Sequence, residues 1–191
     1  MNSHVQVISK GVQRWCIASI TTTLLLFSAN GQARAGCGLT ALPIDPINDS
    51  RTDLFIGKGK TIELEFINMA TGPVIDVFPE PPLIVRNQST GRSCEIDGGI
   101  WVRKHVYLSA NEKQLLLLEY SGANEFLKLY DTATCKQRRE IDVSEGPWVL
   151  EGDTLRVGHG CTSRDIASCS AVRQFTLGKS CKFIPHQSTK K

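Results

Sequence analysis

Six cysteines lie after residue 35, and they constrain the fold more than any other feature of the sequence. A seventh, Cys16, falls in an N-terminal stretch that is typical of an export signal. An even number of cysteines in an exported chain predicts disulfides. Spacing favours one pair, Cys161 with Cys169, because it closes a single short polar loop; the other pairings stay open. The six expected disulfide cysteines are Cys37, Cys94, Cys135, Cys161, Cys169 and Cys181.

The first 35 residues have the order of a secretory signal peptide. Lys10 and Arg14 precede an apolar run over residues 17–29, and Ala33 and Ala35 form a small-x-small cleavage site. We expect cleavage after Ala35, leaving residues 36–191 as a single β-rich domain in the periplasm.

Two alternatives to cleavage are disfavoured by the same residues. The apolar run of about 13 residues is short against the ~20 that span a membrane, so we expect no stable membrane anchor. Cys37 follows Ala35-Gly36 as in a lipoprotein, but Arg34 stands where such a signal has an apolar residue.

The net positive charge of the chain comes from its N-terminal signal segment. The whole sequence has 22 basic and 19 acidic residues, and residues 1–35 contain three of the basic ones and none of the acidic ones. The remaining domain is formally neutral, which argues against a nucleic-acid partner or an anionic lipid surface.

Metal and cofactor motifs are absent from the sequence. No C-x-x-C pair occurs, and His159 with Cys161 is a lone near-pair. The acidic and amide residues at 45–53 lack the spacing of a calcium loop, so residues 36–53 are interpreted as a solvated loop. We therefore expect no metal and no cofactor.

Alternating polar and apolar residues predict β-strands through most of the domain. Residues 61–67 alternate at period two, and residues 115–118 form an apolar run that indicates a strand buried on both faces. Turn-rich connectors separate the segments. The predicted strands are 61–67, 74–78, 83–86, 100–108, 115–120, 126–130, 138–143, 148–150, 154–157, 172–177 and 182–184.

A faint internal repeat links three parts of the domain. Residues 83–92 resemble residues 127–136 at an offset of 44, and a weaker copy runs through 175–182. Four-strand units at this period are typical of propeller blades, and residues 106–143 resemble a WD40-like blade. Three blades are too few to close a ring. We expect an all-β fold of about three antiparallel, blade-like sheets in an open array stapled by disulfides, with a β-sandwich as the alternative.

Catalytic signatures are missing. The sequence contains no G-x-S-x-G, H-E-x-x-H, Walker-loop or dinucleotide motif, and disulfide-bonded cysteines cannot serve as nucleophiles. Asp153 and His159 could meet a serine, but no local pattern requires it. We expect no enzymatic activity, with a hydrolase of cryptic site as an alternative.

Short polar loops on stiff strands suit recognition of a partner. The first candidate loop has a slim, hydrogen-bonding tip and lies between apolar strands; the second lies at the other end of the same strand. The first loop consists of Ser121, Gly122, Ala123, Asn124 and Glu125, and the second contributes Ser109, Asn111 and Glu112.

The signal at 33–35, the β domain of about 150 residues and the loop Tyr120-Ser-Gly-Ala-Asn124 together resemble a family. It is the class of periplasmic immunity proteins that neutralise peptidoglycan amidase effectors delivered by type VI secretion. The resemblance implies a protein partner, a secreted amidase, whose Cys–His active site is occluded by residues 121–125. An exported binding or accessory module for a cell-wall ligand or protein partner is the alternative.

Overall fold

The structure, a computed structural model, describes residues 37–48, 51–69, 75–79 and 81–186, all within one compact unit of residues 33–191. Fifteen strands and one short 3-10 helix, Ile166–Ser168, make up the regular structure of these residues. The predicted all-β class is confirmed. Within this described part, no helix has the length and apolar character needed to cross a membrane. The predicted signal peptide lies outside it.

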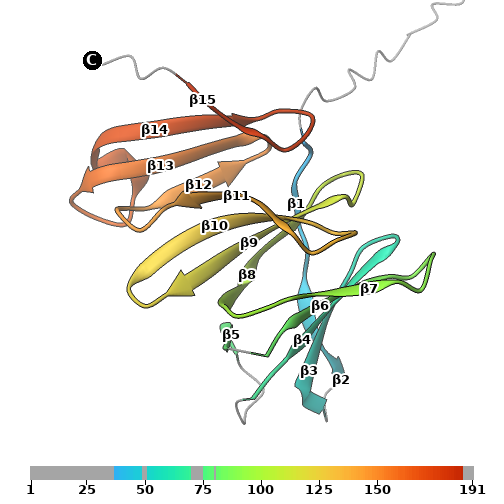
Figure 1. Cartoon of the computed structure of the whole chain (residues 1–191). Helices are drawn as coiled ribbons and strands as arrows, with labels where there is room; N and C mark the ends of the chain where they lie inside the picture. Colours follow the sequence, from blue (N-terminus) through green and yellow to red (C-terminus); the bar gives the residue numbers. More distant parts are fainter. Residues whose placement is uncertain (1–36, 49–50, 70–74, 80, 187–191) are drawn as a thin grey trace, which may run out of the picture. The chain divides into compact units, whose positions relative to one another are not determined.

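The strands form three antiparallel sheets, which confirms the predicted open array (Figure 1). The N-terminal sheet has the order β2-β3-β4-β6-β7, the central sheet β1-β8-β9-β10-β11 with β5 paired to β8, and the C-terminal sheet β12-β13-β14-β15. The N-terminal sheet contains β2 (Ile44–Asn48), β3 (Arg51–Lys58), β4 (Ile62–Ile67), β6 (Leu83–Asn87) and β7 (Ser93–Ile96). The central sheet contains β1 (Thr40–Ala41), β5 (Val77–Pro79), β8 (Ile100–Leu108), β9 (Gln114–Ser121), β10 (Asn124–Asp131) and β11 (Gln137–Asp142). The C-terminal sheet contains β12 (Trp148–Glu151), β13 (Thr154–Cys161), β14 (Cys169–Leu177) and β15 (Phe183–Pro185).

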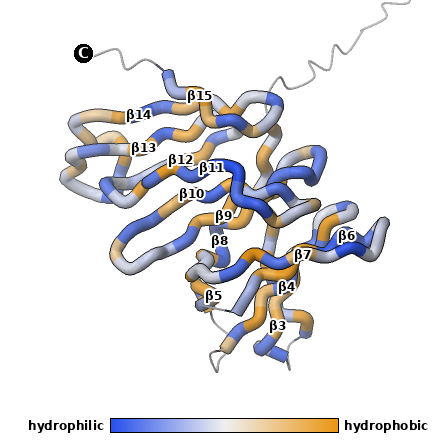
Figure 2. Tube along the Cα trace, in the orientation of Figure 1, coloured by the Kyte–Doolittle hydropathy of each residue, from blue (hydrophilic) through white to orange (hydrophobic). Residues whose placement is uncertain are grey.

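Two hydrophobic cores lie on the two faces of the central sheet. Leu115 and Leu117 of β9 pack with the N-terminal sheet, whereas Leu116 and Leu118 pack with the C-terminal sheet. All four are at most 2% exposed, so the predicted strand buried on both faces is confirmed. The hydropathy-coloured trace shows apolar segments within several strands, whereas the edge strand β11 is mostly hydrophilic (Figure 2). Burial on both faces gives β9 fixed neighbours along most of its length.

Three disulfides join all six described cysteines: Cys37–Cys181, Cys94–Cys135 and Cys161–Cys169. Both the disulfide prediction and the predicted Cys161–Cys169 pair are confirmed. The first bond links residues 144 positions apart, and the second links β7 to the β10–β11 turn across two sheets.

The prediction of a solvated loop over residues 36–53 is wrong. β1, β2 and the start of β3 occupy this stretch, with Ile44 buried in the core. The prediction treated Pro46 as a residue that prevents strand formation. Proline is excluded from central strands but is tolerated in edge strands. β2 is the edge strand of its sheet, and its register shifts next to Pro46. β7 was also not predicted.

Candidate partner-binding site

The first candidate loop is a tight hairpin turn at the end of β9 and β10. Ser121 pairs with Asn124, so only Gly122 and Ala123 lie outside the ladder. Gly122 has φ +64°, as the first central residue of a two-residue hairpin turn requires. Residues 121–124 are all exposed. The tip is therefore narrow, polar and fixed in shape.

A buried ionic network stiffens the hairpin on the face toward the N-terminal sheet. Glu119 is 4% exposed, and its carboxylate accepts hydrogen bonds from Lys128 Nζ at 2.7 Å and from the Tyr130 hydroxyl at 3.3 Å. Burial and the Glu119 charge raise the pKa of Tyr130 well above its usual value, which keeps the phenol protonated as a donor. These cross-strand contacts begin two residues before Ser121.

The base of the hairpin is tied to the β11–β12 connection. The Glu125 amide donates to Ser144 Oγ at 2.8 Å, and the Val143 amide donates to the Glu125 carbonyl at 2.9 Å. Ser144 Oγ in turn donates to Asp142 Oδ1 at 2.6 Å. Hydrogen bonds from the Ser144 hydroxyl and amide lower the pKa of Asp142, so this carboxylate remains an acceptor at neutral pH. The Glu125 backbone is thus fixed while its side chain lines the neighbouring cleft.

A cleft of about 480 Å³ lies beside the hairpin, where the central and C-terminal sheets meet. His105 contacts Trp148 edge-on with ring centroids 4.8 Å apart, and His105 Nδ1 lies 3.2 Å from the Tyr107 hydroxyl. Burial, with a smaller effect of Lys104, lowers the pKa of His105, which favours the neutral imidazole. Aromatic and charged side chains share the lining: His105, Tyr120, Glu125, Glu145, Trp148 and Arg164.

The third element of this end is the disulfide loop between β13 and β14. Asp165 caps the short 3-10 helix by accepting from the Ala167 amide at 2.9 Å. A side chain at Gly158 would collide with Cys169 Sγ, so glycine permits the close approach of strand and disulfide. A contact between His159 Nδ1 and Glu145 Oε2 joins β13 to the β11–β12 connection.

Three connections therefore converge at one end of the sheets: the β9–β10 turn, the β11–β12 connection and the β13–β14 loop (Figure 1). The sequence predicted only the first as a site. The other two were missed because they lie 20 to 40 residues further along the chain and only the folded sheets bring them together.

The second candidate loop, between β8 and β9, is bound within the chain. Ser109 is 2% exposed, and its hydroxyl donates to Asn111 Oδ1 at 2.9 Å. The Glu112 carboxylate accepts from the Thr61 hydroxyl and the Thr61 amide, each at 2.7 Å, and also from the amides of the two adjoining residues. Burial raises the pKa of Glu112, but these hydrogen bonds outweigh it and lower the pKa overall. This carboxylate joins the β8–β9 loop to the β3–β4 turn.

The described residues contain no group of three or more side chains able to hold a metal ion. Within the same residues, no serine hydroxyl forms a hydrogen bond with a histidine ring, and every cysteine is in a disulfide. What this end of the domain offers is a rigid polar tip beside an aromatic, charged cleft.

Comparison with known proteins identifies chains of the same kind. The family model described as "Immune protein Tsi1" matches residues 37–181. A curated Pseudomonas aeruginosa protein with the same description is 35% identical over 160 residues, which cover 83% of this chain and 92% of that protein. The match spans all three sheets, from Cys37 to Cys181.

Proposed function

This chain belongs to the Tsi1 family of immune proteins, and we propose that it neutralises a type VI peptidoglycan amidase by occluding the toxin's active site. Family membership makes it an immunity protein with a toxin as its partner. The proposal adds the toxin's chemistry, the periplasm as the place of action, and the residues that block the site.

The tip of the β9–β10 hairpin carries this proposal. Ser121 and Asn124 present polar side chains on a turn whose only other residues, Gly122 and Ala123, are small. An amidase with a Cys–His active site must admit an extended peptide, so its cleft is narrow and lined with hydrogen-bonding groups. A two-residue turn can enter such a cleft, and a rigid hairpin loses little conformational entropy on binding.

The cleft beside the hairpin completes the contact. Trp148 and Tyr120 supply aromatic surface, while the carboxylate of Glu125 lies at the foot of the tip. Buried aromatic anchors dominate the energy of protein interfaces, and charged residues around them set specificity. In this proposal the tip blocks the catalytic residues and the cleft receives the rim of the toxin. Inhibition needs no chemistry from this chain.

The place of action follows from the leader. Peptidoglycan lies outside the inner membrane, and an immunity protein must meet its toxin there. We propose export by the signal at residues 1–35 and cleavage after Ala35. A periplasmic protein whose mass corresponds to a chain beginning at Gly36 would support this, and a cytoplasmic protein of full length would overturn it.

Ser121→Trp tests the occlusion. A bulky ring on an exposed tip should leave the fold intact but prevent entry, and we expect toxin affinity to fall by about a hundredfold, or ~2.7 kcal/mol. The matched control is Ser89→Trp on the exposed β6–β7 turn. Binding is measured by calorimetry with the co-purified amidase, and inhibition by release of peptide from peptidoglycan. Full inhibition by the Ser121→Trp protein would refute the occlusion.

A further inference from the structure

A second cleft lies at the opposite end of the central and C-terminal sheets. It has a volume of about 490 Å³ and is formed by the end of the β10–β11 hairpin and the β14–β15 turn. Its polar lining includes Gln137, Arg138, Arg139, Ser180 and Lys182, and we name it the basic cleft. None of these residues belongs to the partner-binding end.

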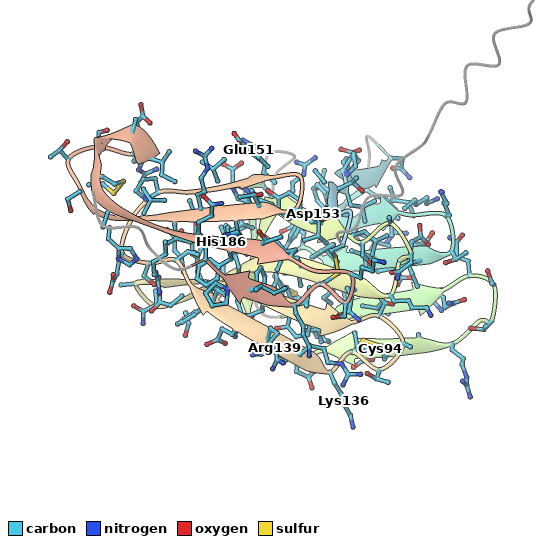
Figure 3. All side chains as sticks on the ribbon, turned by 90° about the horizontal axis from the view of Figure 1, so that it is seen from above. Cys94, Lys136, Arg139, Glu151, Asp153 and His186 are labelled. Atoms are coloured by element: carbon cyan, nitrogen blue, oxygen red, sulfur yellow. A yellow bond between two sulfur atoms is a disulfide. The ribbon has the colours of Figure 1, made fainter. Side chains whose placement is uncertain are left out.

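The basic cleft carries an excess of positive charge. Arg138 forms an ion pair with Asp131 at 2.9 Å, and that contact is the main reason for the lowered pKa of Asp131. Arg139 and Lys182 have no ion pair in the described part of the chain, and Asp131 is the only acid in the lining. Figure 3 shows Arg139 and Lys136 on the side of the domain away from Glu151.

Flanking residues extend this charge. Lys136 directly precedes Gln137 of the lining, and Lys179 lies in the β14–β15 turn that contributes Ser180 and Lys182. Both lysines are exposed. The neutral overall charge of the domain therefore hides a local excess of basic residues: three bases and one acid lie in the lining, and Lys136, Lys179 and Glu140 flank it. Such a concentration costs free energy through self-repulsion and attracts anions.

Disulfides hold both walls of the basic cleft. Cys181, in the lining, is bonded to Cys37, and Cys135, next to Lys136 in the β10–β11 turn, is bonded to Cys94. Both turn cysteines have positive φ, 55° at Cys135 and 54° at Cys181, which fixes the turns that present the basic residues. The cationic groups are thus attached to a stiff backbone, which reduces the entropic cost of gathering them around a ligand.

We propose that the basic cleft binds a phosphate-bearing anion. The guanidinium of Arg139 can donate two parallel hydrogen bonds to phosphate oxygens, and Lys182 adds a point charge with three donors. Ser180 supplies a neutral donor in the same lining, and the Gln137 amide, which donates to Glu140 Oε2 at 3.2 Å, has a second N–H. The phosphate could belong to an anionic lipid headgroup or to a soluble molecule, and the volume accommodates more than one phosphate group.

The test uses the protein purified after export, with its disulfides formed. One arm is flotation with vesicles of phosphatidylethanolamine and phosphatidylglycerol in equal parts, against vesicles of phosphatidylcholine. The other arm is calorimetric titration with inorganic pyrophosphate. The variants are Arg139→Glu and Lys182→Glu. Arg92→Glu is the matched control, because it makes the same charge change on the exposed β6–β7 turn.

We expect binding in at least one arm, weakened about tenfold by either cleft variant and unchanged by Arg92→Glu. Binding of the phosphatidylglycerol-containing vesicles, without binding of pyrophosphate, assigns a membrane surface. Binding of pyrophosphate alone assigns a soluble ligand. Absence of binding in both arms overturns the proposal, as does equal weakening by Arg92→Glu. Circular dichroism of each variant verifies that the fold is retained. None of these measurements involves the toxin, so the result for anion binding is independent of the proposed function.

Discussion

Gly122 shows how one residue shapes the tip. Its φ of +64° lies in the left-handed region, and a Cβ built there would meet no atom within 4 Å. Glycine is therefore favoured here by backbone conformation, because residues with a Cβ are destabilised by about 1–2 kcal/mol in this region. Gly91 in the β6–β7 turn has nearly the same φ, +68°, and the same open surroundings. The two glycines form a natural pair of test and control.

Gly122→Ala and Gly91→Ala should each lower the free energy of unfolding by about 1 kcal/mol, because both place a Cβ at positive φ. Only Gly122→Ala should also weaken toxin binding, since it alters the tip. Urea denaturation gives the first quantity and calorimetry with the amidase the second. Equal toxin affinity of the two variants would place the contact elsewhere on the domain.

Repeated elements explain which parts of the fold could be predicted. The turn at 87–92 and the turn at 131–136 have the same hydrogen bonds: Thr90 and Thr134 amides donate to Asn87 and Asp131 side chains at 3.0 and 3.1 Å. The residues with positive φ, Gly91, Cys135 and Cys181, occupy corresponding positions of the three copies. The first two copies of the predicted repeat therefore encode the same turn, whereas the third forms a shorter turn in which the Gly178 amide donates to the Lys182 carbonyl at 3.0 Å. The strands before these turns, β6, β10 and β14, were predicted, whereas β7 after the first turn was not.

The N-terminal segment was mispredicted because, apart from the β2–β3 hairpin, its contacts are non-local. Cys37 is bonded to Cys181, the Gly38 amide donates to Asp153 Oδ1 at 2.7 Å, β1 pairs with β8, and β2 pairs with β3. One stretch of chain thus contacts all three sheets in turn (Figure 1). No local pattern specifies such partners, and a proline-rich edge strand resembles a loop in sequence.

This role predicts a ranking of the disulfides. Replacing Cys37 and Cys181 together by serine should lower the free energy of unfolding by about 3–5 kcal/mol, because the bond closes the longest loop and anchors the segment that spans the sheets. Replacing Cys161 and Cys169, only 8 positions apart, should cost less. Urea denaturation of both double variants measures the difference. A larger loss from the Cys161/Cys169 pair would show that the N-terminal segment contributes little.

At the scale of the whole domain, β9 connects the two candidate sites. Gln114 at its start lines the basic cleft, and Ser121 at its end belongs to the tip. The tip could be proposed as a site from the sequence because its residues are consecutive. Neither cleft could be predicted from the sequence. Each is lined by residues of two different sheets, and these residues come together only when the sheets pack on the faces of the central sheet. The net charge of the domain also did not predict the basic cleft, because it sums the charges of surfaces that lie apart in the folded protein.

The length of β9 predicts that the two ends act independently. Eight residues of strand place the sites roughly 25 Å apart, beyond the ~10 Å within which substitutions usually couple. Ser121→Trp should therefore weaken toxin binding about a hundredfold without changing anion binding, and Arg139→Glu should weaken anion binding about tenfold without changing toxin binding. The combined variant should show both losses, each equal to that of its single variant within about 0.5 kcal/mol. Calorimetry with the amidase and with pyrophosphate, or vesicle flotation, measures the two affinities. A toxin affinity that changes when the basic cleft is filled would show that β9 transmits binding between its ends, because coupling between sites is reciprocal.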